Sequence, residues 1–197
     1  MESNYKTKNI VLVVLGVSVI LIFIVVFAFI MFFKDQKNNV NEVVKNSVVT
    51  MNYKTATNQF TLLNLSPLSN EVGKDLRAEG SYFDFSVSSE MDKDTSVDYE
   101  IALIKDERST IPDSDVVVYL EKQTSGSYAK VEEPSFFTPI KKKTSLGSPS
   151  KSMVLDRVSL SSEKIDNYRL RLWVREGAII DPNATYSVKV SVYGKAK

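Results

Sequence analysis

The chain has 197 residues, of which 25 are lysine or arginine and 24 are aspartate or glutamate, so its formal net charge at pH 7 is +1. This balance argues against a nucleic-acid partner, which requires a clear basic excess. The chain contains neither cysteine nor histidine. Disulfide scaffolds, thiolate zinc sites, cysteine nucleophiles and triads with a histidine base are therefore excluded.

An uncharged apolar run extends from Ile10 to Phe33 and follows a short basic tail, residues 1–9. At about 1.5 Å per residue, a helix of this length reaches about 36 Å, which is enough to cross a hydrocarbon core of about 30 Å. We therefore predict a single transmembrane helix that holds the chain in the lipid bilayer. A cleaved signal peptide is the alternative, but its apolar part is only about 7–15 residues long.

The lysines on either side of this run do not fix its orientation. Lys6 and Lys8 precede it, and Lys34, Lys37 and Lys45 follow it, so the positive-inside rule is indecisive. A short basic tail before a first span is typical of a signal anchor. We therefore expect a single-pass cell-membrane protein whose C-terminal domain is extracytoplasmic.

Residues 34–59 join the apolar run to the predicted domain as a juxtamembrane spacer or stalk. Four valines between Val40 and Val48 follow i, i+3, i+4, i+8 spacing, which indicates one apolar helix face. Because valine and asparagine are weak helix formers, an irregular spacer or a first strand from about Val48 to Met51 is an equal alternative.

From Phe60 onward, apolar residues alternate with polar ones, which is the pattern of half-buried strands. We predict strands over 60–65, 83–88, 98–104, 116–122, 154–160, 168–175 and 186–192. Proline, glycine and aspartate mark the turns between them. Residues 70–77 and 161–166 are expected to form short helical turns.

About seven strands without a long helical pattern between them predict an all-β domain over residues 60–197. Its expected architecture is an antiparallel β-sandwich, Ig-like or jelly-roll-like, with a closed barrel as the alternative. Alternation predicts that the core contains Phe83, Phe85, Leu170, Leu172, Val188 and Val190. It predicts that Asp84, Arg169, Arg171 and Lys189 face outwards or line a groove.

One predicted strand carries the main candidate binding surface. Arg169, Arg171, Trp173 and Arg175 alternate with apolar residues and so share one face. Such side chains bind anionic groups or glycans through bidentate contacts and stacking. The alternative is that this face meets water or the acids of a neighbouring strand. Residues 141–143, three lysines, are assigned to a solvated loop, with anionic lipid headgroups or wall polymers as the alternative contact.

No catalytic residue, metal site or cofactor is predicted. The seven glycines do not fall in the order of a phosphate-binding loop. Acidic pairs at positions 92/94, 113/115 and 132/133 lack the spacing of a calcium loop, and we assign them to solvated turns. Because paired carboxylates also serve glycosidases, a carboxylate-dependent hydrolase is the third functional hypothesis.

Two segments, residues 98–122 and 165–197, resemble parts of membrane-anchored surface proteins from low-GC Gram-positive bacteria. More distantly, this pattern is similar to the TasA/camelysin group of secreted β-sandwich proteins. The resemblance implies an N-terminal hydrophobic segment, one sandwich domain, assembly into extracellular fibres and, for some members, peptidase activity. The chain departs from the group because it has no histidine for a zinc peptidase and no clear cleavage site.

Together, the sequence predicts a non-enzymatic structural or interaction protein that displays one β-sandwich outside the membrane. A surface module that binds a glycan or a protein is the alternative. The expected partners are a cell-surface protein, a glycan or a second copy of the chain. Self-association is included because the strand over 186–193 ends close to the chain terminus and can add to a sheet edge.

Overall fold

The structure is a computed structural model that describes residues 49–53, 55, 57–90 and 95–197. The basic tail, the predicted transmembrane helix over 10–33 and the spacer up to residue 48 lie outside the described residues. Within the part that is described, no helix combines the length and apolar character that a membrane crossing requires.

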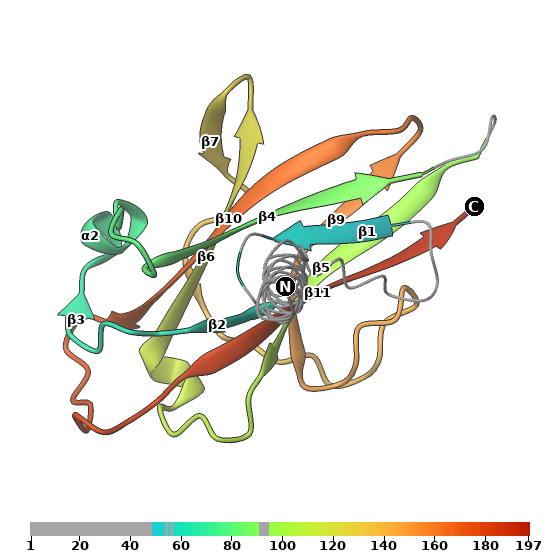
Figure 1. Ribbon diagram of the computed structural model, residues 1–197. Helices are drawn as coiled ribbons and strands as arrows, with labels where there is room; N and C mark the ends of the chain where they lie inside the picture. The colour runs from blue at the N-terminus through green and yellow to red at the C-terminus, as the bar shows by residue number, and fades with distance from the viewer. Residues whose placement is uncertain (1–48, 54, 56, 91–94) are drawn as a thin grey trace, which may run out of the picture. The chain divides into compact units, whose positions relative to one another are not determined.

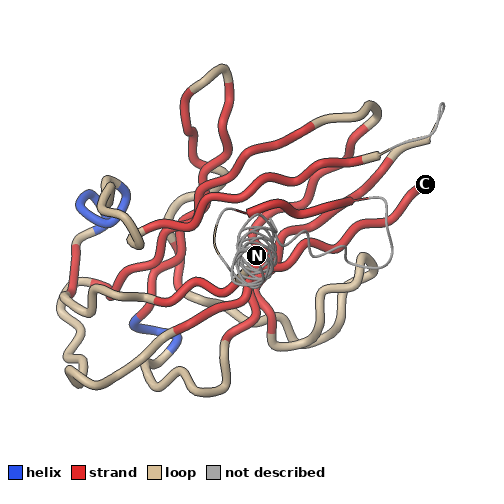
Figure 2. Tube along the Cα trace, viewed as in Figure 1, coloured by secondary structure: helices blue, strands red, loops and turns tan. Residues whose placement is uncertain are grey.

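The described chain is all-β (Figures 1 and 2). Its strands are β1 (Val49–Tyr53), β2 (Gln59–Thr61), β3 (Pro67–Leu68), β4 (Tyr82–Ser89), β5 (Val97–Lys105), β6 (Val116–Thr124), β7 (Ser127–Lys130), β8 (Ser135–Phe136), β9 (Ser152–Leu160), β10 (Ile165–Arg175) and β11 (Ser187–Ala196). The helical segments among the described residues are short: α2 (Asn70–Lys74) and the 3₁₀ turn η1 (Asp113–Asp115).

The strands form two sheets. Sheet A has the order β1–β4–β10–β6–β7, with β3 beside β10 and β8 beside β6, and sheet B has the order β2–β11–β5–β9. The strands pair in antiparallel fashion, except that β3 runs parallel to β10 over two residues. Both strand paths are open, in keeping with two packed sheets rather than one closed barrel.

One apolar core lies between the two sheets. The six residues predicted to form it are each at most 4% exposed: Phe83, Phe85, Leu170, Leu172, Val188 and Val190. The rings of Phe60 in sheet B and Phe83 in sheet A lie 6.0 Å apart, so side chains from both sheets meet. Strict alternation in β4 and β10 explains why this part of the core is predictable from sequence.

The outer face of sheet A differs from the prediction at one position. Asp84 and Arg169 are half-buried and Lys189 of sheet B is exposed, but Arg171 is only 5% exposed. The prediction that Arg171 faces outwards is correct for the direction of its side chain and wrong for its exposure. The segment after α2 covers it, because the Arg171 Nε donates to the carbonyl oxygen of Leu76 at 2.9 Å.

Strand β1 lies within residues 34–59, for which the sequence predicted either a spacer or a first strand near Val48 to Met51. It pairs with β4 from Val49 to Tyr53, and its side chains alternate between buried and half-buried. The strand alternative is therefore the one found, and the folded domain includes residues before Phe60.

One predicted helical turn is replaced by a strand, and the other is confirmed. Residues 165 and 166, predicted as part of a turn, begin β10, where Ile165 and Asp166 pair with Ser88 and Val87 of β4. Apolar alternation did not show this, because Ile165 is 66% exposed whereas Asp166 is buried. The predicted helical turn at 70–77 is confirmed over Asn70–Lys74.

Candidate functional site

All four predicted binding residues of β10 lie on the outer face of sheet A, and Arg169 contacts both a carboxylate and two aromatic rings. Its Nε and Nη2 donate to the two carboxylate oxygens of Asp84 at 2.7 and 2.8 Å. Its guanidinium carbon lies 4.1 Å from the ring centroid of Tyr82 and 4.4 Å from that of Tyr128. The hydrogen bonds to Asp84 raise the pKa of Arg169. The bidentate edge of this arginine is thus occupied by the protein itself.

The other two arginines of β10 also have internal carboxylate partners. Arg171 Nη1 contacts Glu121 on β6, and Arg175 Nε donates to Asp115 at 2.8 Å. An anionic ligand would have to displace these carboxylates. The geometry therefore matches the alternative in which the arginines meet acids of neighbouring elements.

Trp173 packs beneath α2 and is fully buried. A methyl group placed on Gly73 of α2 would come within 2.3 Å of the indole ring, so the helix backbone rests directly on the indole. Together with Val117 and Tyr119, Trp173 forms a small apolar cluster on the outer face of sheet A. This tryptophan anchors α2 and does not offer a face for stacking on a ligand.

A groove of about 660 Å³ opens on the same outer face, and we call it the β8 groove. One wall is the start of α2 with Asn70 and Glu71, and the other wall is β8 with Phe136, a residue that is 47% exposed. Val117 and Arg175 also line it. Of the four predicted binding residues, Arg175 alone contributes to this lining.

The charge of the β8 groove comes from carboxylates. Hydrogen bonds from its own backbone N–H and from Ser69 lower the pKa of Glu71, so this side chain is ionised at neutral pH. Glu176, at the end of β10, is exposed and also lines the groove. The positive charge of Arg175 is matched by Asp115. No sequence pattern predicts this site, because Glu71, Phe136 and Glu176 come from three separate segments that only the fold brings together.

A second group of polar residues lies buried between the sheets. The Tyr99 hydroxyl lies 2.6 Å from the Tyr168 hydroxyl and 2.8 Å from the Asp166 carboxylate. This carboxylate also accepts a hydrogen bond from Lys122 Nζ at 2.8 Å. Burial raises the pKa of both tyrosines, so they stay neutral. Burial alone would raise the pKa of Asp166, but hydrogen bonds from Lys122, Lys164 and Tyr99 together lower it. These groups satisfy one another and join the two sheets.

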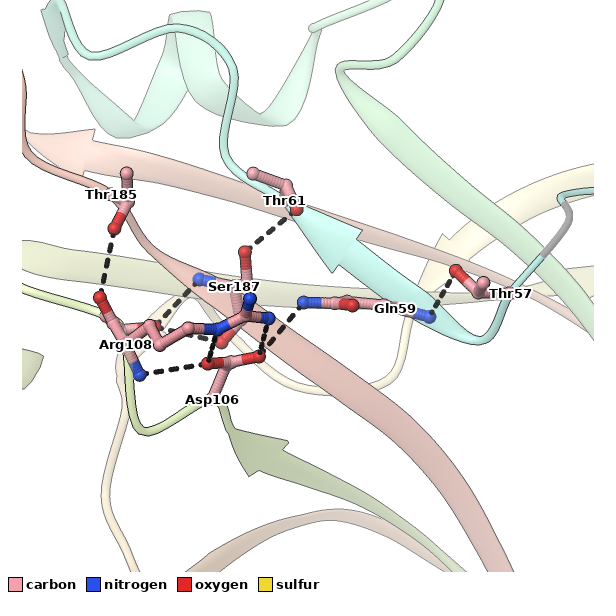
Figure 3. Close-up of polar contacts among 8 residues, drawn as sticks. Thr57, Gln59, Thr61, Asp106, Arg108, Thr185 and Ser187 are labelled. Atoms are coloured by element: carbon pink, nitrogen blue, oxygen red, sulfur yellow. Dashed lines mark hydrogen bonds and ion pairs between the residues drawn. The ribbon is translucent and has the colours of Figure 1, made fainter.

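Figure 3 shows a third polar cluster, at the junction of β2, β11 and the loop after β5. Asp106 accepts hydrogen bonds from the Arg108 side chain at 2.9 and 3.0 Å and from Gln59 at 3.1 Å. The side chain and backbone N–H of Arg108 lower the pKa of Asp106 to about 2. The hydroxyls of Thr61 and Ser187 lie 2.8 Å apart. This cluster fastens β2 and the loop to β11, and its donors and acceptors are used internally.

The described residues contain no group of three or more histidine, cysteine, aspartate or glutamate side chains placed to hold a metal ion. The three lysines at 141–143 are exposed in the loop between β8 and β9. The β8 groove is thus the site on the described surface that combines a hollow, an exposed aromatic side chain and carboxylates that form no salt bridge within the described residues.

Comparisons with models of protein families, with curated proteins and with solved structures found no match for this chain. The similarity to the TasA/camelysin group stays a prediction from sequence.

Proposed function

We propose that the protein is a membrane-anchored, extracytoplasmic interaction protein without enzymatic activity, whose Ig-like or jelly-roll-like β-sandwich binds a partner through the β8 groove. The observation that carries this proposal is the groove itself, which is lined by an exposed phenylalanine, by other apolar side chains and by two exposed glutamates. Ligand pockets commonly combine an apolar lining with a few placed polar groups. The polar clusters elsewhere in the described domain use their donors and acceptors internally.

The anchoring part of the proposal rests on the sequence, through the uncharged run over 10–33. Protease treatment of intact cells, followed by mass spectrometry, tests it. We expect external protease to release peptides from beyond Lys34. A domain that stays protected until the membrane is opened contradicts the proposed orientation.

The binding part is tested by photo-crosslinking on intact cells. Phe136→p-benzoylphenylalanine places the crosslinker in the groove, and the same replacement at Ile165 is the matched control, because Ile165 is apolar, 66% exposed and outside the groove. We expect a discrete adduct from position 136 alone. Equal adducts at both positions, or none at position 136, contradict a partner site at this groove.

A further inference from the structure

We infer that the β8 groove binds an extended peptide segment in which basic side chains alternate with aliphatic ones; this inference rests on the proposed binding role of the groove. Three features of the groove lead to this partner: the sign of its charge, the chemistry of its lining and its position on a strand surface.

The first feature is the pair of exposed carboxylates that line the groove, Glu71 and Glu176. Arg175 pairs with Asp115 at 2.8 Å, and Lys74 of α2 pairs with Glu133 at 3.1 Å. The charge of Lys74 also contributes to lowering the pKa of Glu71, but neither Glu71 nor Glu176 forms a salt bridge in the described part of the chain. Both are exposed and line the groove. Charge complementarity therefore favours a cationic ligand and disfavours an anionic glycan or a phosphorylated one.

The second feature is the apolar surface between these carboxylates. Val117 lies on the outer face of β6, and Phe136 of β8 sits directly across from it in the strand register. Leu68 of β3 adds a third apolar side chain to the lining. Aliphatic side chains and the methylene stem of a lysine or arginine pack on such a surface while the charged end reaches a rim carboxylate.

The third feature is the shape of the support. The lining comes from β3, β10, β6 and β8, which lie side by side in sheet A, so the groove crosses neighbouring strands. Its volume of about 660 Å³ lies within the range of small-ligand pockets. An extended chain presents alternate side chains to one face, which suits an apolar surface flanked by charges. A neutral glycan suits it less, because the tryptophan on this face is buried beneath α2.

The test measures binding to the full-length protein in detergent micelles by fluorescence polarisation. The probes are three fluorescein-labelled ligands: a capped pentapeptide of alternating valine and lysine, the same peptide with glutamate in place of lysine, and a pentamer of N-acetylglucosamine. We expect the lysine peptide to bind best, with an affinity that falls as salt is added.

The variants locate the site. The double variant Glu71→Gln and Glu176→Gln should weaken binding of the lysine peptide about fivefold, since exposed ion pairs are individually weak. Phe136→Ala should weaken it further, whereas Glu107→Gln, an exposed glutamate outside the groove, should leave it unchanged. Thermal unfolding of each variant verifies that the domain stays folded.

The outcomes separate this inference from the proposed function. If the glycan pentamer binds and only Phe136→Ala weakens it, the groove is a binding site and the basic-peptide inference is wrong. Tighter binding of the glutamate peptide, unchanged binding by the double variant, or no binding of any probe also overturns the inference. The proposed function itself is judged by the adduct at position 136 and by the protease experiment.

Discussion

Replacing Gly73 by alanine places a methyl group against Trp173, the only tryptophan of the chain. The added carbon would lie 2.3 Å from two atoms of the indole ring. Carbon atoms in contact sit at about 3.5 Å or more, so the helix or the ring must move by about 1.2 Å. The indole cannot retreat easily, because it is fully buried and packs against Tyr119 with ring centroids 6.3 Å apart.

Overpacking of this kind destabilises a protein by about 1–3 kcal/mol. The higher helix propensity of alanine offsets up to about 1 kcal/mol of this loss. We expect Gly73→Ala to lower the free energy of unfolding by about 1–2 kcal/mol. Since α2 has only five residues and lies outside the main core, the strain should be relieved by α2 moving away from sheet A. Trp173 then becomes accessible while the two sheets persist.

Tryptophan fluorescence reports this movement directly. We expect the emission of Gly73→Ala to shift to longer wavelength and to be quenched by acrylamide, with an unchanged far-ultraviolet strand signal. Val72→Ala is the control, because Val72 belongs to the same helix and is 52% exposed. If Gly73→Ala has the emission and urea midpoint of the wild type, α2 does not rest on Trp173.

Four further outcomes are expected. Leu172→Ala, at a site 1% exposed, should lower the unfolding free energy by about 2–5 kcal/mol in urea titrations, whereas Ile165→Ala should change it by less than about 0.5 kcal/mol. Asp166→Asn should destabilise by about 2–3 kcal/mol at pH 7; because the folded state lowers the pKa of Asp166, this difference should shrink below about pH 4 as the wild-type carboxylate takes up a proton. Deleting residues 185–197 should unfold the domain by circular dichroism, because β11 lies between β2 and β5 in sheet B. A double-mutant cycle of Asp84→Ala and Arg169→Ala should give a coupling energy of about 1 kcal/mol.

Each of these has a contrary result. A Leu172→Ala shift within experimental error would mean that the inward face of β10 is assigned wrongly. If the difference in unfolding free energy between Asp166→Asn and the wild type does not change with pH, the negative charge of Asp166 does not stabilise the domain. If the truncated chain stays folded and the intact chain self-associates, β11 serves a neighbouring copy. A coupling energy near zero would mean that Asp84 does not hold Arg169, so that this arginine can bind a ligand.

Local periodicity was enough to predict the longer strands and their inner faces. β4, β5, β6, β9 and β10 follow the predicted positions closely because apolar residues recur at every second position in them. Periodicity did not predict strands that are very short or in which apolar residues are not the buried ones. β3 and β8 have two residues each, which is too short for any period. At the start of β10, the apolar Ile165 is exposed and the charged Asp166 is buried, so apolar character does not follow burial there.

The sequence left open whether the last strand closes its own sandwich or pairs with a neighbouring copy at a sheet edge, and the structure places β11 inside sheet B. β11 pairs with β5 from Val188 to Ala196, and the three-residue strand β2 covers its other side near Val188. An end strand of the chain can thus be an inner strand of the sheet, since strand order depends on distant segments rather than on chain order. Lending β11 to a neighbouring copy would require both pairings to break.

The face of β10 shows why a correctly predicted surface can still have a different chemistry. Alternation places Arg169, Arg171 and Arg175 on one side of the strand, which by itself favours an anionic ligand. The partner strands decide the outcome. Asp84 stands opposite Arg169 in a single register, and a shift of two residues would bring Tyr82 or Ser86 there instead. Asp84, Glu121 and Asp115 neutralise the three arginines. The exposed charges left at the β8 groove without a salt bridge in the described residues are the carboxylates of Glu71 and Glu176, so the ligand that we infer is basic rather than anionic.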